Sequence, residues 1–179
     1  MSERISLIFG KTGTGKSTLA KELIKDQNRV IIIDPQREYN ETIIFENIPS
    51  LWDYIEKNEN FGVLSCRFET DLEIDYLFRT CKIIGNLTLV VEEAEIYISP
   101  NARSGYFLDL VRYGRHKGVK IIGIARRRAE LSADFRGMCE VIYSFKQTEP
   151  LDIDAMKKLS NDFNGLENLK DHDFIKVIL

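Results

Sequence analysis

The chain has 179 residues, of which 44% are hydrophobic and 30% charged, and its formal net charge is −3. This length suits one domain with a substantial core and is short for two, so we expect a single domain over residues 1–179. The composition is that of an ordinary globular protein and excludes a disordered chain. Its longest apolar runs fall far short of a membrane span, and three widely spaced cysteines suit reduced thiols in the cytosol.

The first motif follows an apolar run at residues 5–9 and precedes a helix-forming segment at residues 16–25. Strand, glycine-rich turn and helix form the context of a phosphate-binding P-loop, in which backbone N–H groups and the helix N-terminus surround a phosphate. Lys16 is expected to reach the β- and γ-phosphates of ATP, and the Ser17 hydroxyl is expected to ligate Mg²⁺. The nucleotide-binding residues predicted from G-x-x-x-x-G-K-[ST] and its surroundings are Gly10, Lys11, Thr12, Gly13, Thr14, Gly15, Lys16, Ser17 and Thr18.

Apolar runs then alternate with helix-forming segments along the rest of the chain. This alternation predicts an α/β fold of the P-loop NTPase (RecA-like, ASCE) type, with a mostly parallel sheet and helices on both faces. Ligands of such sheets bind at the carboxyl ends of the strands. The expected strands are 29–34, 62–67, 87–91, 119–125 and 141–145, and the expected helices are 50–58 with Ser50 as N-cap, 71–84, 105–117 and 150–159.

A second motif places two carboxylates at the end of a buried strand, where residues 87–94 read LTLVVEEA. Neighbouring residues at a strand end point in different directions, so the two acids can divide their work. We expect Glu92 to hold Mg²⁺ through its water shell and Glu93 to polarise the attacking water. Aspartate is usual at the first position, but the longer glutamate still reaches a metal through water. The alternative is a pair of exposed acids in a turn.

Positive charge is concentrated in residues 101–128, which hold eight Lys or Arg residues and one acid. This segment carries +7, so the remainder of the chain carries −10. A protein that coats nucleic acid over its whole surface is basic throughout, whereas a local basic segment fits a confined contact with phosphates. The alternative is a solvated basic helix face. The basic residues are Arg103, Arg112, Arg115, Lys117, Lys120, Arg126, Arg127 and Arg128.

Over most of its length, the sequence resembles the HerA–FtsK superfamily of P-loop motor ATPases. Four segments carry this resemblance besides the two motifs above: DPQREY at 34–39, RYGRHKGV at 112–119, IIGIARRR at 121–128 and FKQTEPLD at 145–152. The second and third segments look like those of genome-packaging ATPases from membrane-containing icosahedral viruses and related prophages. Arg126 stands at the position of the family's sensor glutamine, which reads the state of the γ-phosphate.

The resemblance implies an ATPase that forms a homo-oligomeric ring and translocates double-stranded DNA to package a viral or prophage genome. It further implies portal or membrane-vertex partners, and a location in the host cytoplasm or at the virion vertex. Arg112 or Arg115 is expected to be a catalytic arginine finger inserted into a neighbouring subunit, and one or more of residues 126–128 to contact DNA or another subunit. Two alternatives remain: a cellular relative that serves DNA processing or conjugation, and a monomeric P-loop small-molecule kinase.

Overall fold

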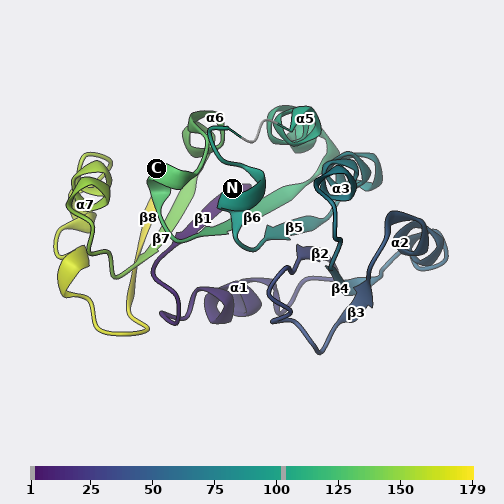
Figure 1. Cartoon of the computed structure of the whole chain (residues 1–179), viewed down its shortest axis with the longest axis horizontal. Coiled ribbons are helices and arrows are strands. Elements are labelled where there is room, and N and C mark those ends of the chain that lie inside the picture. The colour runs from purple at the N-terminus through teal and green to yellow at the C-terminus, as the bar shows by residue number, and fades with distance from the viewer. Residues whose placement is uncertain (1–2, 102–103) are drawn as a thin grey trace.

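A computed structural model describes residues 3–101 and 104–179 and shows one eight-stranded sheet between helices (Figure 1). The strand order is β3-β4-β2-β5-β6-β1-β7-β8, and every neighbouring pair is parallel except β7 and β8. The predicted α/β fold with a mostly parallel sheet is therefore confirmed. The strands are β1 (Ile5–Phe9), β2 (Arg29–Ile33), β3 (Ile43–Phe45), β4 (Gly62–Cys66), β5 (Thr88–Val91), β6 (Lys120–Ala125), β7 (Val141–Phe145) and β8 (Phe174–Ile178).

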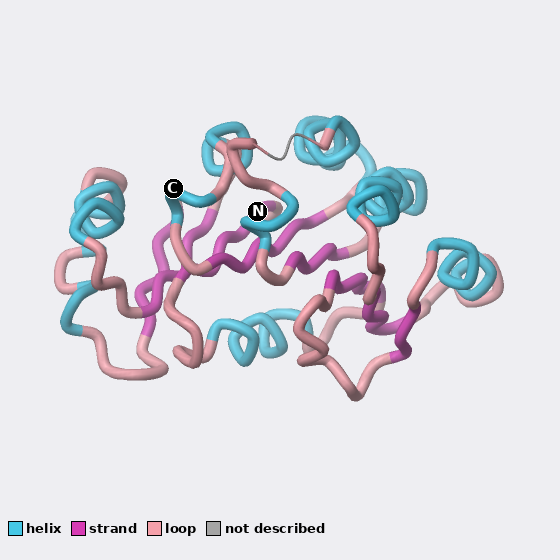
Figure 2. The backbone as a smooth tube through the Cα atoms, viewed as in Figure 1, coloured by secondary structure: helices cyan, strands magenta, loops and turns pink. Residues whose placement is uncertain are grey.

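Helices cover both faces of this sheet (Figures 1 and 2). Helix α1 (Lys16–Ile24) lies on one face, and α3 (Asp71–Ile84), α5 (Gly105–Tyr113) and α6 (Ala133–Gly137) lie on the other. Helix α2 is near the β3 edge and α7 near the β8 edge. The remaining helical elements are α2 (Ile48–Ile55), α4 (Ala94–Tyr97), α7 (Pro150–Lys157) and the 3₁₀ turns η1 (Gly114–Lys117), η2 (Arg128–Glu130), η3 (Asn161–Phe163) and η4 (Leu166–Asn168).

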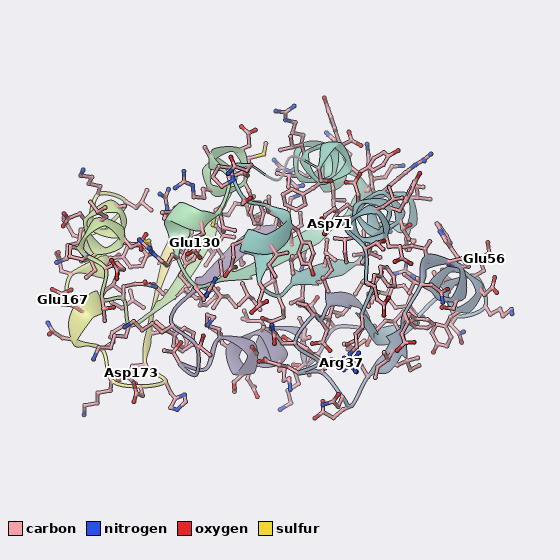
Figure 3. The ribbon with its side chains drawn as sticks, in the orientation of Figure 1. Arg37, Glu56, Asp71, Glu130, Glu167 and Asp173 are labelled. Atoms are coloured by element: carbon pink, nitrogen blue, oxygen red, sulfur yellow. The ribbon has the colours of Figure 1, made fainter. Side chains whose placement is uncertain are left out.

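The central strands are mostly apolar because both of their faces are buried. Successive side chains of a strand point to opposite faces, so Leu7 and Phe9 of β1 join the core beneath α3 and α5. Ile8, between them, joins the core beneath α1. Acidic side chains such as Glu56 and Asp173 extend from the outer parts of the molecule (Figure 3), in keeping with the negative charge outside the basic segment.

Three predicted helices need corrected boundaries, and the one expected at 150–159 ends at Lys157. The helix expected at 50–58 begins at Ile48, because the Asn47 side chain accepts the Ser50 N–H (2.9 Å) and is the N-cap in place of Ser50. The helix expected at 105–117 is α-helical only to Tyr113 and continues as the tighter turn η1. The boundaries expected for α3, residues 71–84, are confirmed.

Two edge strands were missed. Strand β3 has only three residues, and β8 pairs antiparallel to β7 at the opposite edge. Two of the β3 residues and three of the β8 residues are exposed, so neither segment has the continuous buried pattern that identifies the central strands. Within residues 3–101 and 104–179, no helix is long and apolar enough to cross a membrane.

Candidate active site

A cleft of about 370 Å³ lies at the carboxyl ends of β1, β5 and β6, as parallel-sheet topology predicts. It brings together most of the P-loop, both acids that follow β5, and Arg126. Gly10, Lys11 and Thr14 belong to the same loop but do not line the cleft. The lining residues are Thr12, Gly13, Gly15, Lys16, Ser17, Thr18, Gln36, Glu38, Glu92, Glu93, Glu95, Ile124, Ala125, Arg126 and His172.

Close packing and backbone conformation require two of the P-loop glycines. A Cβ atom on Gly10 would lie 2.7 Å from the Phe145 Cβ and 2.8 Å from the Thr14 hydroxyl oxygen, closer than such atoms approach. Gly15 has a φ of 100° and is the N-cap of α1, a left-handed conformation that only glycine adopts readily. The loop therefore passes close to the end of strand β7 and then turns directly into the N-terminus of α1, the kind of helix end that favours a phosphate.

The Lys16 ammonium lies inside this loop. Its Nζ donates to the Lys11 carbonyl (2.9 Å), and the Thr14 hydroxyl donates to the same oxygen (2.8 Å). Burial lowers the pKa of Lys16, and the neighbouring acids Glu92, Glu95 and Glu38 act in the opposite direction. A cation held next to the helix N-terminus, in a partly desolvated position, is suited to contact phosphate oxygens.

The two acids after β5 face different partners. Glu92 is buried and accepts a hydrogen bond from the Tyr39 hydroxyl (2.6 Å). Glu93 accepts one from the Gln36 amide (3.0 Å) and has a left-handed backbone conformation, with φ and ψ both 47°. This conformation is uncommon for a residue other than glycine, and it turns the chain between neighbouring acids. The two carboxylates therefore have separate surroundings at the mouth of one cleft.

Burial is the main reason that the pKa of Glu92 is raised from 4.5 to about 7. Repulsion by Glu38 adds to this rise, whereas hydrogen bonds from Tyr39 and Ser17 and attraction to Lys16 oppose it. Burial and the nearby Glu92 also raise the pKa of Tyr39. Tyr39 thus stays a neutral hydroxyl that donates to the carboxylate.

The oxygen donors of this site fit a magnesium ion. Glu92 and Ser17 supply a carboxylate and a hydroxyl to the same cleft, next to the phosphate-binding loop. Among residues 3–101 and 104–179, no group of three or more His, Cys, Asp or Glu side chains is arranged to hold a metal ion. Mg²⁺ commonly takes one or two protein ligands and completes its shell with phosphate oxygens and water. When bound, such an ion neutralises charge on the phosphates.

Glu92→Gln is expected to stabilise the nucleotide-free and metal-free protein at pH 8. Because the folded protein binds the Glu92 proton more tightly than the unfolded chain, the stability contributed by this proton is present below about pH 4.5 and is lost as the pH rises through about 7. The shift corresponds to at most about 3 kcal/mol at pH 8. Urea unfolding in EDTA at pH 5 and pH 8 tests this: the advantage of the variant should shrink toward pH 5, and a variant less stable than wild type at pH 8 would contradict the burial argument.

The arginines predicted as site residues lie in different places. Arg126 lines the cleft and pairs with Glu95 (Nε–Oε1 3.1 Å). Arg112 of α5 lies 4.0 Å from Asp134 of α6, on the face opposite α1 and outside the cleft. Arg115 is exposed in η1, which precedes β6 and so lies near the amino end of that strand. Neither Arg112 nor Arg115 therefore contacts the nucleotide cleft of its own chain.

The other predicted DNA contacts are held within the chain to different degrees. Arg127 pairs with the buried Asp152 (2.5 Å) and so links the end of β6 to α7. Arg128 is half-buried, and burial lowers its pKa. Arg103 lies outside the described residues.

The cleft includes residues that sequence reasoning did not assign to it. His172, from the turn before β8, lies so close to the P-loop that a Cβ atom on Gly15 would be 3.0 Å from its Nδ1. Gln36 lines the cleft and Tyr39 bonds to Glu92 behind it; both come from the DPQREY segment, which signalled a family resemblance but no role for either side chain. For His172, the sequence held no signal, because only the strand order places β8 beside β7, which in turn lies next to β1.

This fold and cleft define a P-loop NTPase. Residues 1–93 match the family described as "Helicase HerA, central domain", and the chain belongs to that family. A further match covers 74 residues at 35% identity to nitrogenase iron protein 2 of Methanobacterium ivanovii; it includes 38% of this chain and only 28% of that protein. The chain therefore spans well under half the length of this relative.

Solved structures share the whole fold. The genome-packaging NTPase B204 of Sulfolobus turreted icosahedral virus 2, in complex with AMP, is 19% identical with a TM-score of 0.82, and the match covers 99% of this chain and 94% of that one. VirB4 of Thermoanaerobacter pseudethanolicus is 15% identical with a TM-score of 0.61, with 98% and 89% covered. At these identities, the likeness concerns the fold, and it confirms the predicted P-loop NTPase architecture.

Proposed function

We propose that this protein hydrolyses ATP to drive double-stranded DNA through a homo-oligomeric ring during the packaging of a viral or prophage genome. The observation that supports hydrolysis is the pairing of the P-loop with Glu93 at the mouth of one cleft. Glu93 is only partly buried and its carboxylate accepts a hydrogen bond from Gln36, so it is placed to accept a proton from a water molecule.

The proposal of a homo-oligomeric ring is based on the separation between two arginines and the cleft of their own chain. An arginine finger neutralises charge that develops on the transferred phosphate, and it can come from a neighbouring subunit. Arg112 and Arg115 are exposed and distant from the cleft of their own chain, as a finger that acts on another subunit requires. Arg126 lines its own cleft and is the candidate for sensing the γ-phosphate in place of a glutamine.

DNA translocation is supported by charge and by a fold shared over 99% of this chain with a protein named as a genome-packaging NTPase. Within the basic segment, ion pairs already hold Arg126 and Arg127. Lys117 and Lys120, by contrast, are exposed between the end of η1 and the start of β6. We place the first contacts with DNA phosphates on these two lysines, while the acidic remainder of the surface keeps DNA away from other faces. Portal or membrane-vertex proteins are the partners of this proposal.

Duplex DNA is expected to raise ATP turnover at low salt, and DNA affinity should fall steeply as salt increases. The double variant Lys117→Ala/Lys120→Ala should lower the salt slope by up to about two contacts, without a change in ATP affinity. Lys57→Ala/Lys158→Ala removes two exposed lysines elsewhere and is the matched control. Absence of both DNA binding and turnover stimulation in the wild-type protein would overturn the translocase proposal, and phosphate transfer to a small acceptor would favour a kinase.

A further inference from the structure

One loop contacts both acids at the end of β5. It spans residues 34–42, after β2, and donates hydrogen bonds from Tyr39 to Glu92 and from Gln36 to Glu93. In the sheet, β2 lies between β5 on one side and β4 on the other. A loop that leaves the carboxyl end of β2 therefore lies between the end of β4 and the two acids.

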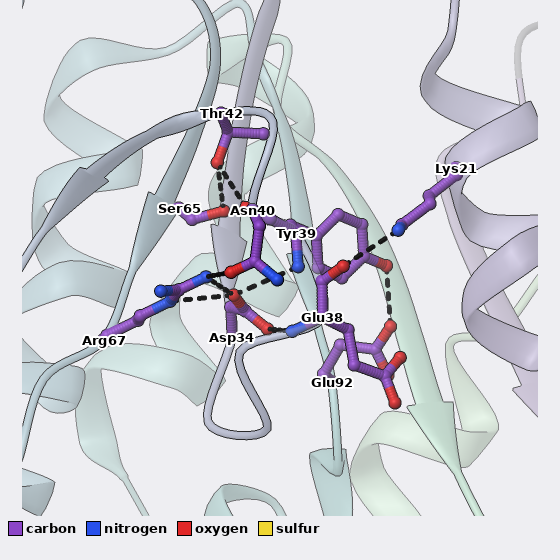
Figure 4. A network of polar contacts seen from close by, with 9 residues as sticks. All are labelled: Lys21, Asp34, Glu38, Tyr39, Asn40, Thr42, Ser65, Arg67 and Glu92. Carbon is purple, nitrogen blue, oxygen red and sulfur yellow. Dashed lines mark hydrogen bonds and ion pairs between the residues drawn. The ribbon is translucent and has the colours of Figure 1, made fainter.

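A buried ion pair anchors this loop to the end of β4 (Figure 4). The Asp34 carboxylate is fully buried, and Arg67 approaches its Oδ2 through Nε (3.0 Å) and Nη2 (2.9 Å). Asp34 also accepts the backbone N–H groups of Glu38 (2.8 Å) and Tyr39 (3.4 Å). Arg67 donates to the Asn40 side chain as well (2.9 Å). This largely buried ion pair, with the hydrogen bonds around it, holds the backbone of the loop in one arrangement.

The Tyr39 ring is restrained from the α1 side too. Its residue is only 2% exposed, and the Lys21 ammonium lies 4.9 Å from the ring centroid. Lys21 also donates to the Glu38 carbonyl (2.9 Å), and the Thr42 hydroxyl donates to the Tyr39 carbonyl (2.9 Å). The Tyr39 ring and the backbone of residues 38 and 39 are thus both held by contacts other than the hydrogen bond to Glu92.

We propose that Tyr39 is a positioning residue that holds the Glu92 carboxylate toward Ser17 and the P-loop. This inference rests on the proposed role of Glu92 in holding the water shell of Mg²⁺. A short hydrogen bond from a neutral hydroxyl to a buried carboxylate is strong, and it occupies Oε1 of Glu92. Ser17 and Glu92 line the same cleft, so the bond from Tyr39 restricts the rotation of the carboxylate on the side of the P-loop and the N-terminus of α1.

The test is the magnesium dependence of nucleotide binding in Tyr39→Phe, which removes one hydroxyl and keeps the ring. With a fluorescent non-hydrolysable ATP analogue, the Mg²⁺ concentration for half-maximal tight binding should rise about tenfold, as expected for one lost hydrogen bond to a charged group. Affinity without magnesium should stay at the wild-type value. Tyr143→Phe, which alters a buried tyrosine outside the cleft, is the matched control and should match wild type.

A double-mutant cycle separates positioning from a general structural effect. Glu92→Gln alone should raise the magnesium requirement, and adding Tyr39→Phe to it should change that value less than about twofold, because the two residues act as a unit. If Tyr39→Phe does not fold, Lys21→Met removes the cation beside the ring and should raise the same requirement about threefold. A magnesium requirement unchanged in Tyr39→Phe, or in Lys21→Met where that variant has to be used, would overturn the proposal, as would an equal rise on both backgrounds of the cycle.

These measurements contain no DNA, so their result is independent of translocation. A higher magnesium requirement in Tyr39→Phe, together with no stimulation of wild-type ATP turnover by DNA, would support the positioning role of Tyr39 and contradict DNA translocation. A higher magnesium requirement in Glu92→Gln but not in Tyr39→Phe would support the metal-holding role of Glu92 and contradict the positioning role of Tyr39. No shift in Glu92→Gln would remove the role of Glu92 on which this inference rests.

Discussion

Glu93→Gln is expected to slow ATP hydrolysis by about 10²- to 10⁴-fold, the range typical of a lost general base. The amide has nearly the same shape as the carboxylate but cannot accept a proton from water. Because Glu93 is held by Gln36 rather than by the P-loop, its replacement leaves the phosphate-binding residues in place. Single-turnover hydrolysis and equilibrium binding of Mg-ATP should therefore separate, with affinity close to wild type and a much lower rate.

Glu56→Gln is the matched control for this change, since Glu56 is an exposed glutamate at the end of α2. It should hydrolyse ATP at the wild-type rate. If Glu93→Gln turned over within about threefold of wild type, Glu93 would not be the residue that activates water, since the loss of a general base costs far more than that.

Lys16→Ala is expected to abolish measurable hydrolysis and to weaken ATP binding about 10- to 100-fold, the range for one lost hydrogen bond to a charged group. In this structure, the Lys16 ammonium donates a hydrogen bond to the Lys11 carbonyl, within the P-loop. Removing it takes away the cation that meets the β- and γ-phosphates, where charge develops during transfer.

Lys25→Ala, in which an exposed lysine at the C-terminal end of α1 is removed, controls for the loss of one positive charge from the same helix. Isothermal titration with ATP and a phosphate-release assay give the two readouts. Turnover of Lys16→Ala within tenfold of wild type would contradict the assignment of the phosphate site.

The local parts of this site were predictable from the sequence. The P-loop is one continuous segment of nine neighbouring residues, so a short motif in the sequence is enough to predict its geometry. The positions of the two acids after β5 were equally predictable, because the buried strand Thr88–Val91 is followed directly by Glu92 and Glu93 at its carboxyl end. The mostly parallel sheet followed from the alternation of strands and helices.

The parts that were missed depend on contacts between distant segments. Tyr39 acts on Glu92 only because β2 and β5 are neighbours in the sheet, and strand order cannot be read from a strand's own residues. His172 reaches the P-loop because β8 returns antiparallel to β7. The start of α2 was misplaced because Asn47 and Ser50 are both good capping residues, and backbone geometry selected the earlier one.

The basic segment shows the same limit. Eight positive charges in one stretch of sequence indicated a single phosphate-binding surface. The fold instead turns Arg126 into the nucleotide cleft and pairs Arg127 with the buried Asp152, while Lys117 and Lys120 remain exposed. Charge counted along the chain therefore overestimates the charge available to a partner, because the fold uses part of it internally.

Displacement of a third strand from duplex DNA is the most direct measurement of a translocating motor. A linear duplex carries a triplex-forming oligonucleotide at one end, and its release is followed by fluorescence at low salt. The proposed function predicts release that requires hydrolysable ATP and Mg²⁺, and none with Glu93→Gln, even though that variant still binds ATP. ATP hydrolysis by the wild-type protein on this duplex, with the third strand remaining in place, would contradict DNA translocation.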